Sequence, residues 1–314
     1  MYLEKRKTKK GIKYFLAHSF REGDKIHKIR KLLGCNLSEE VLNDRMEKAK
    51  QLILEEISKY NILQAPLYDK ISKEELEFIK KLQTEANLKV VHLSETEWKK
   101  FSKVFSYNTN AIEGSDLTMK ETKEVIEKGS WPFKKSKEDI AEALGVDEAV
   151  KYIRETKEHL SLDLIKKIHY IVFKNSKNFA GEFRETGQEV VVRTGNGIIV
   201  HEGAPSSRVI YLLKELINWY NKHKKEYPAI LLAAVVHNQF ESIHPFADGN
   251  GRVGRIILNN ILIKNSLPPV NIDLKDQKEY YETLQAYEKQ GNIRPTIDLI
   301  LKEYKYLKKI IKQA

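Results

Sequence analysis

Twelve consecutive residues, HPFADGNGRVGR at 244–255, bring together an imidazole, a carboxylate and two guanidinium groups. The imidazole of His244 titrates near neutral pH, so it can take the proton of a hydroxyl that attacks phosphorus. The carboxylate of Asp248 can hold Mg²⁺, which needs only one or two carboxylates when phosphates and water supply its other ligands. These residue types therefore predict phosphate chemistry.

The glycine-rich turn inside this segment predicts a site for an anion. It consists of Gly249, Asn250 and Gly251, and a helical pattern begins near the last of them. Amides in the first turn of a helix are unpaired and can bind phosphate, and glycine leaves room for a close approach. The Asn250 side chain would add a polar donor. Arg252 and Arg255 stand three residues apart, hence on one helix face, and guanidinium groups grip phosphate well.

Each of these groups also has a structural explanation. The turn and Asp248 can simply cap a helix. His237, on the apolar helix before the segment, is expected to be structural, and Phe246 is expected to anchor the core. A histidine, a carboxylate and two arginines within twelve residues together favour a phosphate site over these structural roles.

The segment resembles the signature of the Fic family, His-x-Phe-x-Asp/Glu-Gly-Asn-Gly-Arg-x-x-Arg, at every fixed position. The resemblance implies a mainly α fold, with a helical core and a β-hairpin flap beside the active site. It implies that His244 is the general base towards a Ser, Thr or Tyr hydroxyl of a target protein. It further implies that Asp248 holds Mg²⁺ on the α- and β-phosphates of ATP, that Arg252 binds phosphates and that Arg255 meets the γ-phosphate.

A second motif, Thr109-Asn-Ala-Ile-Glu113-Gly114, resembles the inhibitory motif of Fic proteins, Ser/Thr-x-x-x-Glu-Gly/Asn. The resemblance implies an inhibitory helix around 106–114, placed before the Fic core. Glu113 would pair with Arg255 and thereby remove the partner of the γ-phosphate. Alone, this pattern is also typical of a Thr-capped helix.

Two weaker matches extend the resemblance. The region with Tyr281 and Asn292 resembles the one that flanks the adenine in Fic folds, which makes both residues candidate nucleotide contacts. The sequence Glu142-Ala-Leu-Gly145 stands where many relatives read Glu-Val-x-Asn. Gly145 replaces the asparagine, so the resemblance does not carry a base contact over to that position.

The composition predicts a soluble globular protein, with 41% hydrophobic and 32% charged residues among 314. No apolar run approaches the roughly 20 residues that span a bilayer. The first residues carry charge without an apolar region after them, so no secretory signal is expected. Cys35 is the only cysteine and cannot form an intrachain disulfide. A cytoplasmic location without membrane contact is therefore expected.

The pattern along the chain predicts four segments. Residues 1–34 are basic and β-rich, with eleven Lys or Arg against three Asp or Glu, and 35–92 are helical. Residues 93–306 form the Fic domain, and 307–314 a basic tail. Within the Fic domain, two β-branched runs flank Asn196-Gly197, a hairpin signal that matches the expected flap.

The function that these motifs predict is protein adenylyltransferase: transfer of AMP from ATP to hydroxyls of a target protein and of the chain itself, autoinhibited by Glu113. One alternative is removal of AMP, with Glu113 activating water. Another is transfer of a different phosphate-containing group, such as UMP or the γ-phosphate. The Doc branch of the superfamily transfers the γ-phosphate, but its motif usually lacks the second arginine, which is Arg255 here. A third is a nucleotide-gated protein that binds nucleic acid through residues 1–34. The target protein and the oligomeric state, a homodimer included, stay open.

Overall fold

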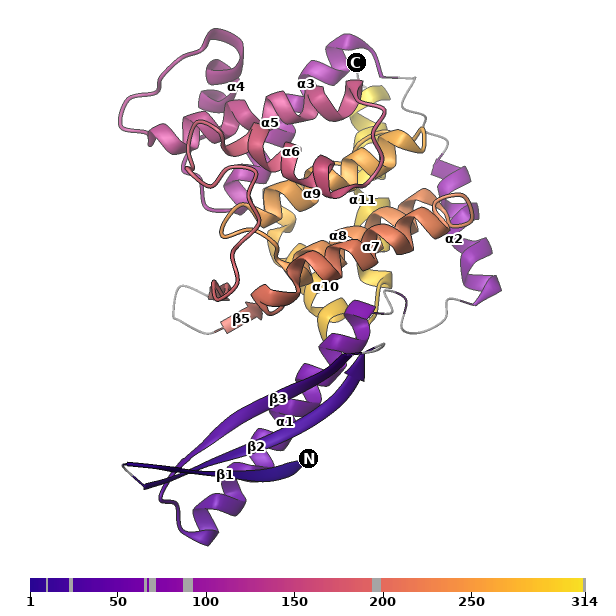
Figure 1. The fold of residues 1–314 in the computed structure, drawn as a ribbon. Helices are drawn as coiled ribbons and strands as arrows, with labels where there is room; N and C mark the ends of the chain where they lie inside the picture. The colour runs from indigo at the N-terminus through magenta and orange to yellow at the C-terminus, as the bar shows by residue number, and fades with distance from the viewer. Residues whose placement is uncertain are drawn as a thin grey trace. The chain divides into compact units, whose positions relative to one another are not determined.

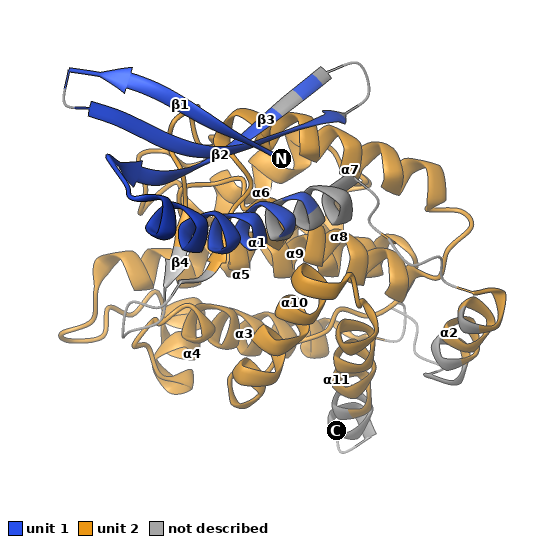
Figure 2. Cartoon of the chain, turned by 90° about the horizontal axis from the view of Figure 1, so that it is seen from below, with its two compact units in different colours: residues 1–62 blue, residues 63–314 orange. Residues whose placement is uncertain are grey.

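The computed structural model describes residues 1–9, 11–22, 25–64, 67, 72–86, 93–193 and 199–312. These fall into two compact units, residues 1–62 and 63–314 (Figure 2). Helices dominate, and the prediction of a mainly α chain with a small N-terminal sheet is confirmed (Figure 1). No helix among the described residues is long and apolar enough to cross a membrane.

The first unit is a three-stranded antiparallel sheet with one helix. Its elements are β1 (Tyr2–Thr8), β2 (Gly11–Glu22), β3 (Lys25–Cys35) and α1 (Glu39–Gln64), with β2 in the centre of the sheet. Leu16 and Ile29 of the sheet share a core with Ala49 and Ile53 of the helix. The apolar stripe of α1 is therefore buried against one face of the sheet.

The second unit is helical apart from one hairpin. Its first elements are α2 (Lys73–Ala86), α3 (Glu95–Ile112), α4 (Met119–Lys128), α5 (Lys137–Glu155), α6 (Leu162–Phe173), β4 (Val191–Arg193) and β5 (Ile199–Glu202). They are followed by η2 (Ser206–Arg208), α7 (Val209–His223), α8 (Ala229–Ile243), α9 (Asn250–Lys264), η3 (Leu274–Asp276), α10 (Gln277–Gln290) and α11 (Arg294–Lys312).

Helix α8 forms the centre of this unit. All of its residues except Ser242 are buried, as expected of a helix whose first two turns, 229–236, are apolar on every side. It packs against α7, α9, α10 and α11, and α9 in turn packs against α3, α5 and α6. The loop 244–249, which joins α8 to α9, is therefore supported from several sides.

Strands β4 and β5 pair antiparallel, so the predicted hairpin is present. Its expected turn at Asn196-Gly197 lies outside the described residues. The second unit begins at Leu63, within the segment 35–92 that the sequence pattern treats as one helical region. Helix α11 continues to Lys312, so most of the segment expected to be a basic tail is helical, and 313–314 are outside the described residues.

Candidate functional site

The loop between α8 and α9 is held in one shape by its own residues. His244, with φ of 52°, ends α8, and Gly249, with φ of 81°, precedes α9. The Asn250 side chain accepts from the amide of Phe246 and donates to its carbonyl, both at 2.9 Å. Phe246 is fully buried and stacks on the His169 ring, with centroids 3.8 Å apart. The loop is thus pre-organised.

The half-buried imidazole of His244 is kept neutral by its surroundings. Its Nδ1 lies 3.3 Å from the carbonyl oxygen of Glu241. The His201 ring of the hairpin lies beside it, with centroids 5.2 Å apart. Burial, with a smaller contribution from His201, lowers the pKa of His244 to about 3. The imidazole is therefore neutral near pH 7, which is one requirement of a general base; the other, a pKa near the working pH, is not met in this structure.

Arg184 ties this histidine to the hairpin region. Its fully buried side chain donates to the carbonyl of His244 at 2.8 Å and to that of Ile243 at 3.2 Å. The same guanidinium donates to the carbonyls of Gln188 and Ala204, on either side of the hairpin. One buried cation therefore fixes both the backbone at His244 and the base of the hairpin.

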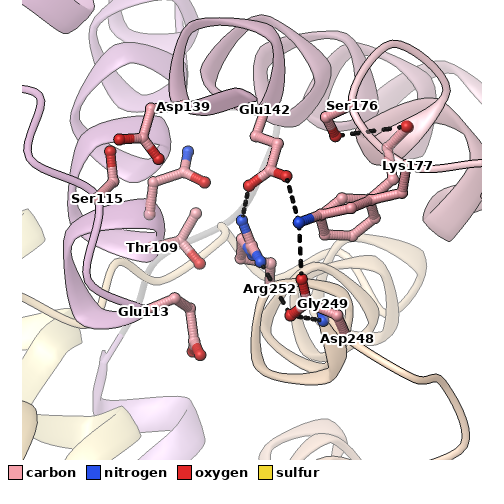
Figure 3. A network of polar contacts seen from close by, with 12 residues as sticks. Thr109, Glu113, Ser115, Asp139, Glu142, Ser176, Lys177, Asp248, Gly249 and Arg252 are labelled. Carbon is pink, nitrogen blue, oxygen red and sulfur yellow. Dashed lines mark hydrogen bonds and ion pairs between the residues drawn. The ribbon is translucent and has the colours of Figure 1, made fainter. Parts of the chain in front are cut away.

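Asp248 lies in a four-member ionic network with Arg252, Lys177 and Glu142 (Figure 3). Lys177 Nζ is 3.0 Å from one carboxylate oxygen of Asp248, and Arg252 Nη2 is 3.5 Å from the other. Glu142, almost fully buried on α5, bonds to Arg252 and lies 3.5 Å from Lys177. Burial tends to raise the pKa of Asp248, but Arg252, Lys177 and the Gly249 amide together have the larger effect. The pKa is therefore below its usual value, and the carboxylate is ionised.

This carboxylate suits Mg²⁺ only when a nucleotide supplies further oxygens. Among the described residues, no group of three or more His, Cys, Asp or Glu could hold a metal ion. The Asp248 side chain is 46% exposed and so remains accessible to a cation. One accessible carboxylate is the donor set expected for Mg²⁺ that binds together with phosphates. Lys177 lies on the same carboxylate and would have to share it or move.

Arg255 is completely enclosed, and Glu113 is its charged partner. Arg255 Nη2 donates to Glu113 Oε1 at 2.7 Å and to the Thr109 carbonyl at 3.0 Å, while Nε donates to Thr109 Oγ1 at 2.7 Å. The Tyr280 hydroxyl lies 3.2 Å from Nη1. Burial opposes the charge, but Tyr280 and Glu113 raise the pKa of Arg255 above its usual value, so the guanidinium stays charged. The pairing that the second motif predicted is present.

The same Glu113 carboxylate lies at the N-terminus of α9. A Cβ on Gly251 would collide with the Glu113 carboxylate and would lie 3.1 Å from Arg255 Nη1. Glu113 itself ends α3, and Gly114 follows with φ of 96°, a conformation that glycine adopts without strain. A carboxylate of the chain therefore occupies the place where unpaired amides and an arginine would receive an anion.

Residues 159–262 match the profile of the Fic/DOC family. The chain is 31% identical over 208 residues to protein adenylyltransferase fic-1 of Caenorhabditis elegans, covering 63% of this chain and 39% of that protein. It is 33% identical over 204 residues to protein adenylyltransferase Fic of Nematostella vectensis, covering 62% and 45%. The chain thus spans less than half the length of these curated relatives.

Two solved structures share the fold. A Fic-domain signaling protein from Bacteroides thetaiotaomicron superposes with a TM-score of 0.62 at 23% identity, covering 72% of this chain and 92% of that one. Residues 134–508 of C. elegans Fic-1 give 0.60 at 24% identity, covering 84% and 82%. Residues 159–262 therefore belong to a Fic domain.

Two predicted nucleotide contacts of the Fic domain lie at its margin. The Tyr281 hydroxyl donates to the Ile112 carbonyl at 3.3 Å, and burial raises the pKa of Tyr281 to about 12. Asn292 is exposed, and its side chain accepts from the Arg294 amide at the start of α11. Tyr281 therefore adjoins the end of α3, whereas the Asn292 side chain holds the first amide of α11. Contact of either residue with nucleotide stays a prediction.

Sequence reasoning assigned the Asn250 side chain to an anion, but the structure uses that side chain within the loop. Its Oδ1 and Nδ2 both bind Phe246, and Nδ2 carries a second hydrogen that these bonds do not use, so contact of the Asn250 side chain with an anion stays a prediction. His237 is buried, with Nε2 3.0 Å from the Tyr280 hydroxyl, in line with the structural role expected for it.

Four polar residues of the site carry no motif that sequence reasoning used: Arg184, Lys177, Glu241 and His201. Arg184 contacts residues up to 60 positions away, and Lys177 meets Asp248 across 71 positions. Glu142 was singled out only as part of a degenerate motif, although it is the charged partner of Arg252. Contacts between residues this far apart leave no local pattern in the sequence from which they could be predicted.

Proposed function

We propose that this Fic domain transfers AMP from ATP to hydroxyl groups of a target protein and of the chain itself, and that Glu113 restrains the reaction. The names of the relatives and the intact signature support the activity. The observation that carries the proposal is the Glu113 carboxylate at the start of α9, bonded to Arg255 beside Gly251. A site that binds its own carboxylate there is suited to a phosphate when the carboxylate withdraws.

The proposed reaction starts at His244. Its neutral imidazole takes the proton of the target hydroxyl while the hydroxyl oxygen forms a bond to the α-phosphorus of ATP. The bond from that phosphorus to the bridging oxygen of the β-phosphate breaks, and pyrophosphate leaves with that oxygen. Arg252, Arg255 and the first amides of α9 neutralise the phosphates, so positioning and charge supply most of the rate enhancement.

Asp248 is the residue that would hold Mg²⁺ in this site. When bound, the ion supplies positive charge at the phosphates and helps to fix their position. Lys177 and Arg252 keep Asp248 ionised when nucleotide is absent, so the carboxylate is ready to act as a ligand.

Glu113 restrains the reaction in this proposal by two effects. Its bond to Arg255 removes a cation from the γ-phosphate, and its negative charge repels phosphate from the start of α9. Its side chain is 27% exposed, so it can swing out without disrupting a core. Arg255 would then keep its two bonds to Thr109, which hold the guanidinium in place.

Incubation with ATP labelled at the α-phosphate, in the presence of Mg²⁺, tests the proposal. The Glu113→Gly protein is expected to label itself and proteins of a source-cell lysate at least about 10-fold more than wild type. The reason is that Arg255, once free to bind phosphate, would stabilise the transition state by more than about 1 kcal/mol. His244→Ala in the same background should abolish labelling. His223→Ala, at the C-terminal end of α7 in an exposed pair with Glu226, is the matched control. No label from the Glu113→Gly protein, despite a native fold, would refute AMP transfer.

Removal of AMP is a second candidate because Glu113 is partly exposed and could hold a water beside the site. Release of AMP from a pre-modified protein distinguishes the two. If Glu113 serves hydrolysis, wild type should release AMP and Glu113→Gly should not. Equal release of AMP by both proteins would contradict that role. Mass analysis of the labelled lysate would also reveal whether UMP or another group is transferred.

The remaining partners are proposals as well. The target segment is proposed to lie along the β4–β5 hairpin, whose His201 adjoins His244. A cytoplasmic location is proposed from the single exposed Cys35. Release of the Glu113 restraint through a change of assembly, a homodimer included, is proposed because such a contact is easily displaced. Light scattering of wild type and Glu113→Gly, with and without ATP, tests the last point.

A further inference from the structure

The N-terminal unit separates charge between its two layers. Residues 1–35 hold eleven Lys or Arg against three Asp or Glu, whereas α1 holds four against six. The sheet is therefore strongly basic and the helix behind it slightly acidic. Solubility alone does not require basic and acidic residues to be separated in this way. A concentrated basic surface is typical of a site that binds a polyanion.

One face of the sheet is already occupied by α1. The side chains that point towards the helix include Leu3 of β1, Leu16 of β2 and Leu33 of β3, which pack with Ile53. The register pairs Leu3 with Leu16, so neighbouring strands present their apolar residues to the same side. Alternation along each strand then sends the intervening residues to the opposite face of the sheet.

That opposite face, here called the open face, carries Arg6, Lys13, Arg21, Lys28 and Arg30, whereas Lys5, Lys7 and Lys31 belong by the same alternation to the face that α1 covers. The paired residues Glu4, Phe15 and Leu32 form one row across it, and Tyr2, Ala17 and Arg30 form the next. Further along, Ser19 pairs with Lys28 and Arg21 with Ile26, while Arg6 pairs with Lys13 at the other end. The open face is defined by Tyr2, Glu4, Arg6, Lys13, Phe15, Ala17, Ser19, Arg21, Ile26, Lys28, Arg30 and Leu32.

The cations of the open face lie along its edges and its ends. Arg6 belongs to the outer strand β1, and Lys28 and Arg30 belong to the outer strand β3. The central strand β2 contributes Phe15, Ala17 and Ser19 between them. Arg6 lies over the Phe15 ring at 5.5 Å and Lys28 over the Tyr2 ring at 5.0 Å, so aromatic rings hold these cations upright.

Glu4 partly neutralises this face. It pairs with Lys28 at 2.8 Å, Arg6 at 2.9 Å and Arg30 at 3.0 Å. Hydrogen bonds from Lys28 and Arg6 lower the pKa of Glu4 to about 2. One carboxylate cannot balance three cations, and the side chains of all three stay 33–48% exposed. They can therefore exchange the carboxylate for phosphate oxygens.

The dimensions of the sheet match the major groove of B-form DNA. Two strand spacings of about 4.8 Å separate β1 from β3, so the strand axes span about 10 Å. The groove is about 12 Å wide, with a phosphate backbone along each side. Cations on the outer strands would meet those backbones while β2 faces the base edges. The major groove of double-stranded RNA is too narrow and deep for such an element, which favours DNA.

We propose that the open face of the sheet in residues 1–62 binds double-stranded DNA through its major groove. This activity goes beyond AMP transfer and would let DNA locate the Fic domain or signal to it. Glu4 acts as an internal competitor of the phosphates. The affinity is expected to be largely electrostatic, because phosphate contacts supply most of the binding to unselected sequence.

Fluorescence anisotropy of the full chain with a labelled 30-base-pair duplex of mixed sequence tests the proposal. Wild type is expected to bind about 10²- to 10³-fold more weakly at 200 mM than at 50 mM NaCl, as about five phosphate contacts require. Lys28→Glu with Arg30→Glu should weaken binding at least 10-fold at 50 mM. Lys48→Glu with Lys50→Glu on the exposed side of α1 makes the same charge change and should leave the affinity within about 3-fold.

A variant that is expected to tighten DNA binding makes the test independent of folding. Glu4→Gln frees three cations and should tighten duplex binding several-fold, an effect that misfolding cannot produce. Equal losses from the open-face and α1 pairs, or no effect of Glu4→Gln, would overturn a site on this face. Tighter binding of single-stranded RNA or of phosphatidylserine vesicles than of the duplex would overturn DNA as its ligand.

Discussion

Glu241 is a buried carboxyl group three residues before the proposed base, within the charged cluster at the start of α9. Its Oε1 lies where Gly254 has no side chain, and a Cβ there would collide with it. Burial raises the pKa of Glu241 to about 8, although Arg255 opposes the shift. The group is therefore neutral at pH 7 in the folded protein, and it leaves Glu113 as the anion that pairs with Arg255.

This shift makes the contribution of Glu241 to stability depend on pH. A carboxyl whose folded pKa exceeds its unfolded value stabilises the fold most below the unfolded pKa, and that stability is lost as pH rises through about 8. Glu241→Gln removes this loss. Between pH 6 and pH 9, we expect the free energy of unfolding of the Gln variant to rise relative to wild type by about 3 kcal/mol, since wild type loses stability over the two pH units up to about 8 and each is worth about 1.4 kcal/mol.

Urea denaturation at pH 6, 7.5 and 9 measures this difference. Glu282→Gln, on the exposed surface of α10, is the control and should change with pH as wild type does. Parallel pH profiles for wild type and Glu241→Gln would contradict a neutral carboxyl at this position.

At the scale of elements, Arg184 joins two parts of the site that are far apart in the chain. It binds the carbonyls at the end of α8 and those at the base of the β4–β5 hairpin. Glu189, its ionic partner at 3.3 Å, also accepts from the amide and hydroxyl of Ser206, beyond the hairpin. His244 and the hairpin therefore share one support, so loss of this support should affect stability and catalysis together.

Arg184→Met keeps an unbranched apolar side chain but leaves several buried carbonyls without a donor. We expect the free energy of unfolding to fall by about 3 kcal/mol or more, because unsatisfied buried polar groups cost about 1–3 kcal/mol each. In the Glu113→Gly background, AMP transfer should fall at least about 10-fold while ATP binding changes little, since Arg252 and Arg255 are untouched. Arg294→Met, whose ion pair with Asp298 is exposed, is the matched control.

Urea unfolding, a nucleotide titration and the labelling assay together check this prediction. A variant that loses stability but transfers AMP at the original rate would show that Arg184 supports only the fold.

How far the sequence predicts this site depends on how local each contact is. The helix pair α8–α9, the loop between them and the hairpin could be predicted because their signals lie within a few residues: an apolar run, Gly249 with Gly251, and Asn196-Gly197 between β-branched runs. The Glu113–Arg255 pair spans 142 positions and was foreseen only through family resemblance. Lys177 with Asp248 and Glu142 with Arg252 had no such aid, because a single sequence contains no information about distant pairs.

At the scale of the whole molecule, the compact units follow packing and not the change from strand to helix. The sequence pattern changes near residue 35, where the sheet ends, yet α1 packs its apolar stripe on that sheet and forms one unit with it. A helical pattern shows that one face is apolar but does not identify the surface that will cover it. For this reason, the division at residue 62 could not be predicted from periodicity.

The division has a consequence for nucleotide binding. The partners of Asp248, Arg252 and Arg255 all come from the second unit, and so do the contacts of His244. Removal of residues 1–62 from the Glu113→Gly protein should therefore leave the Kd for a fluorescent ATP analogue with Mg²⁺ within about 2-fold, while binding of the DNA duplex is lost. Circular dichroism establishes that the shortened chain is folded. A folded shortened chain that binds the nucleotide 10-fold more weakly would mean that the N-terminal unit contributes to the nucleotide site, because no other part of the chain has been removed.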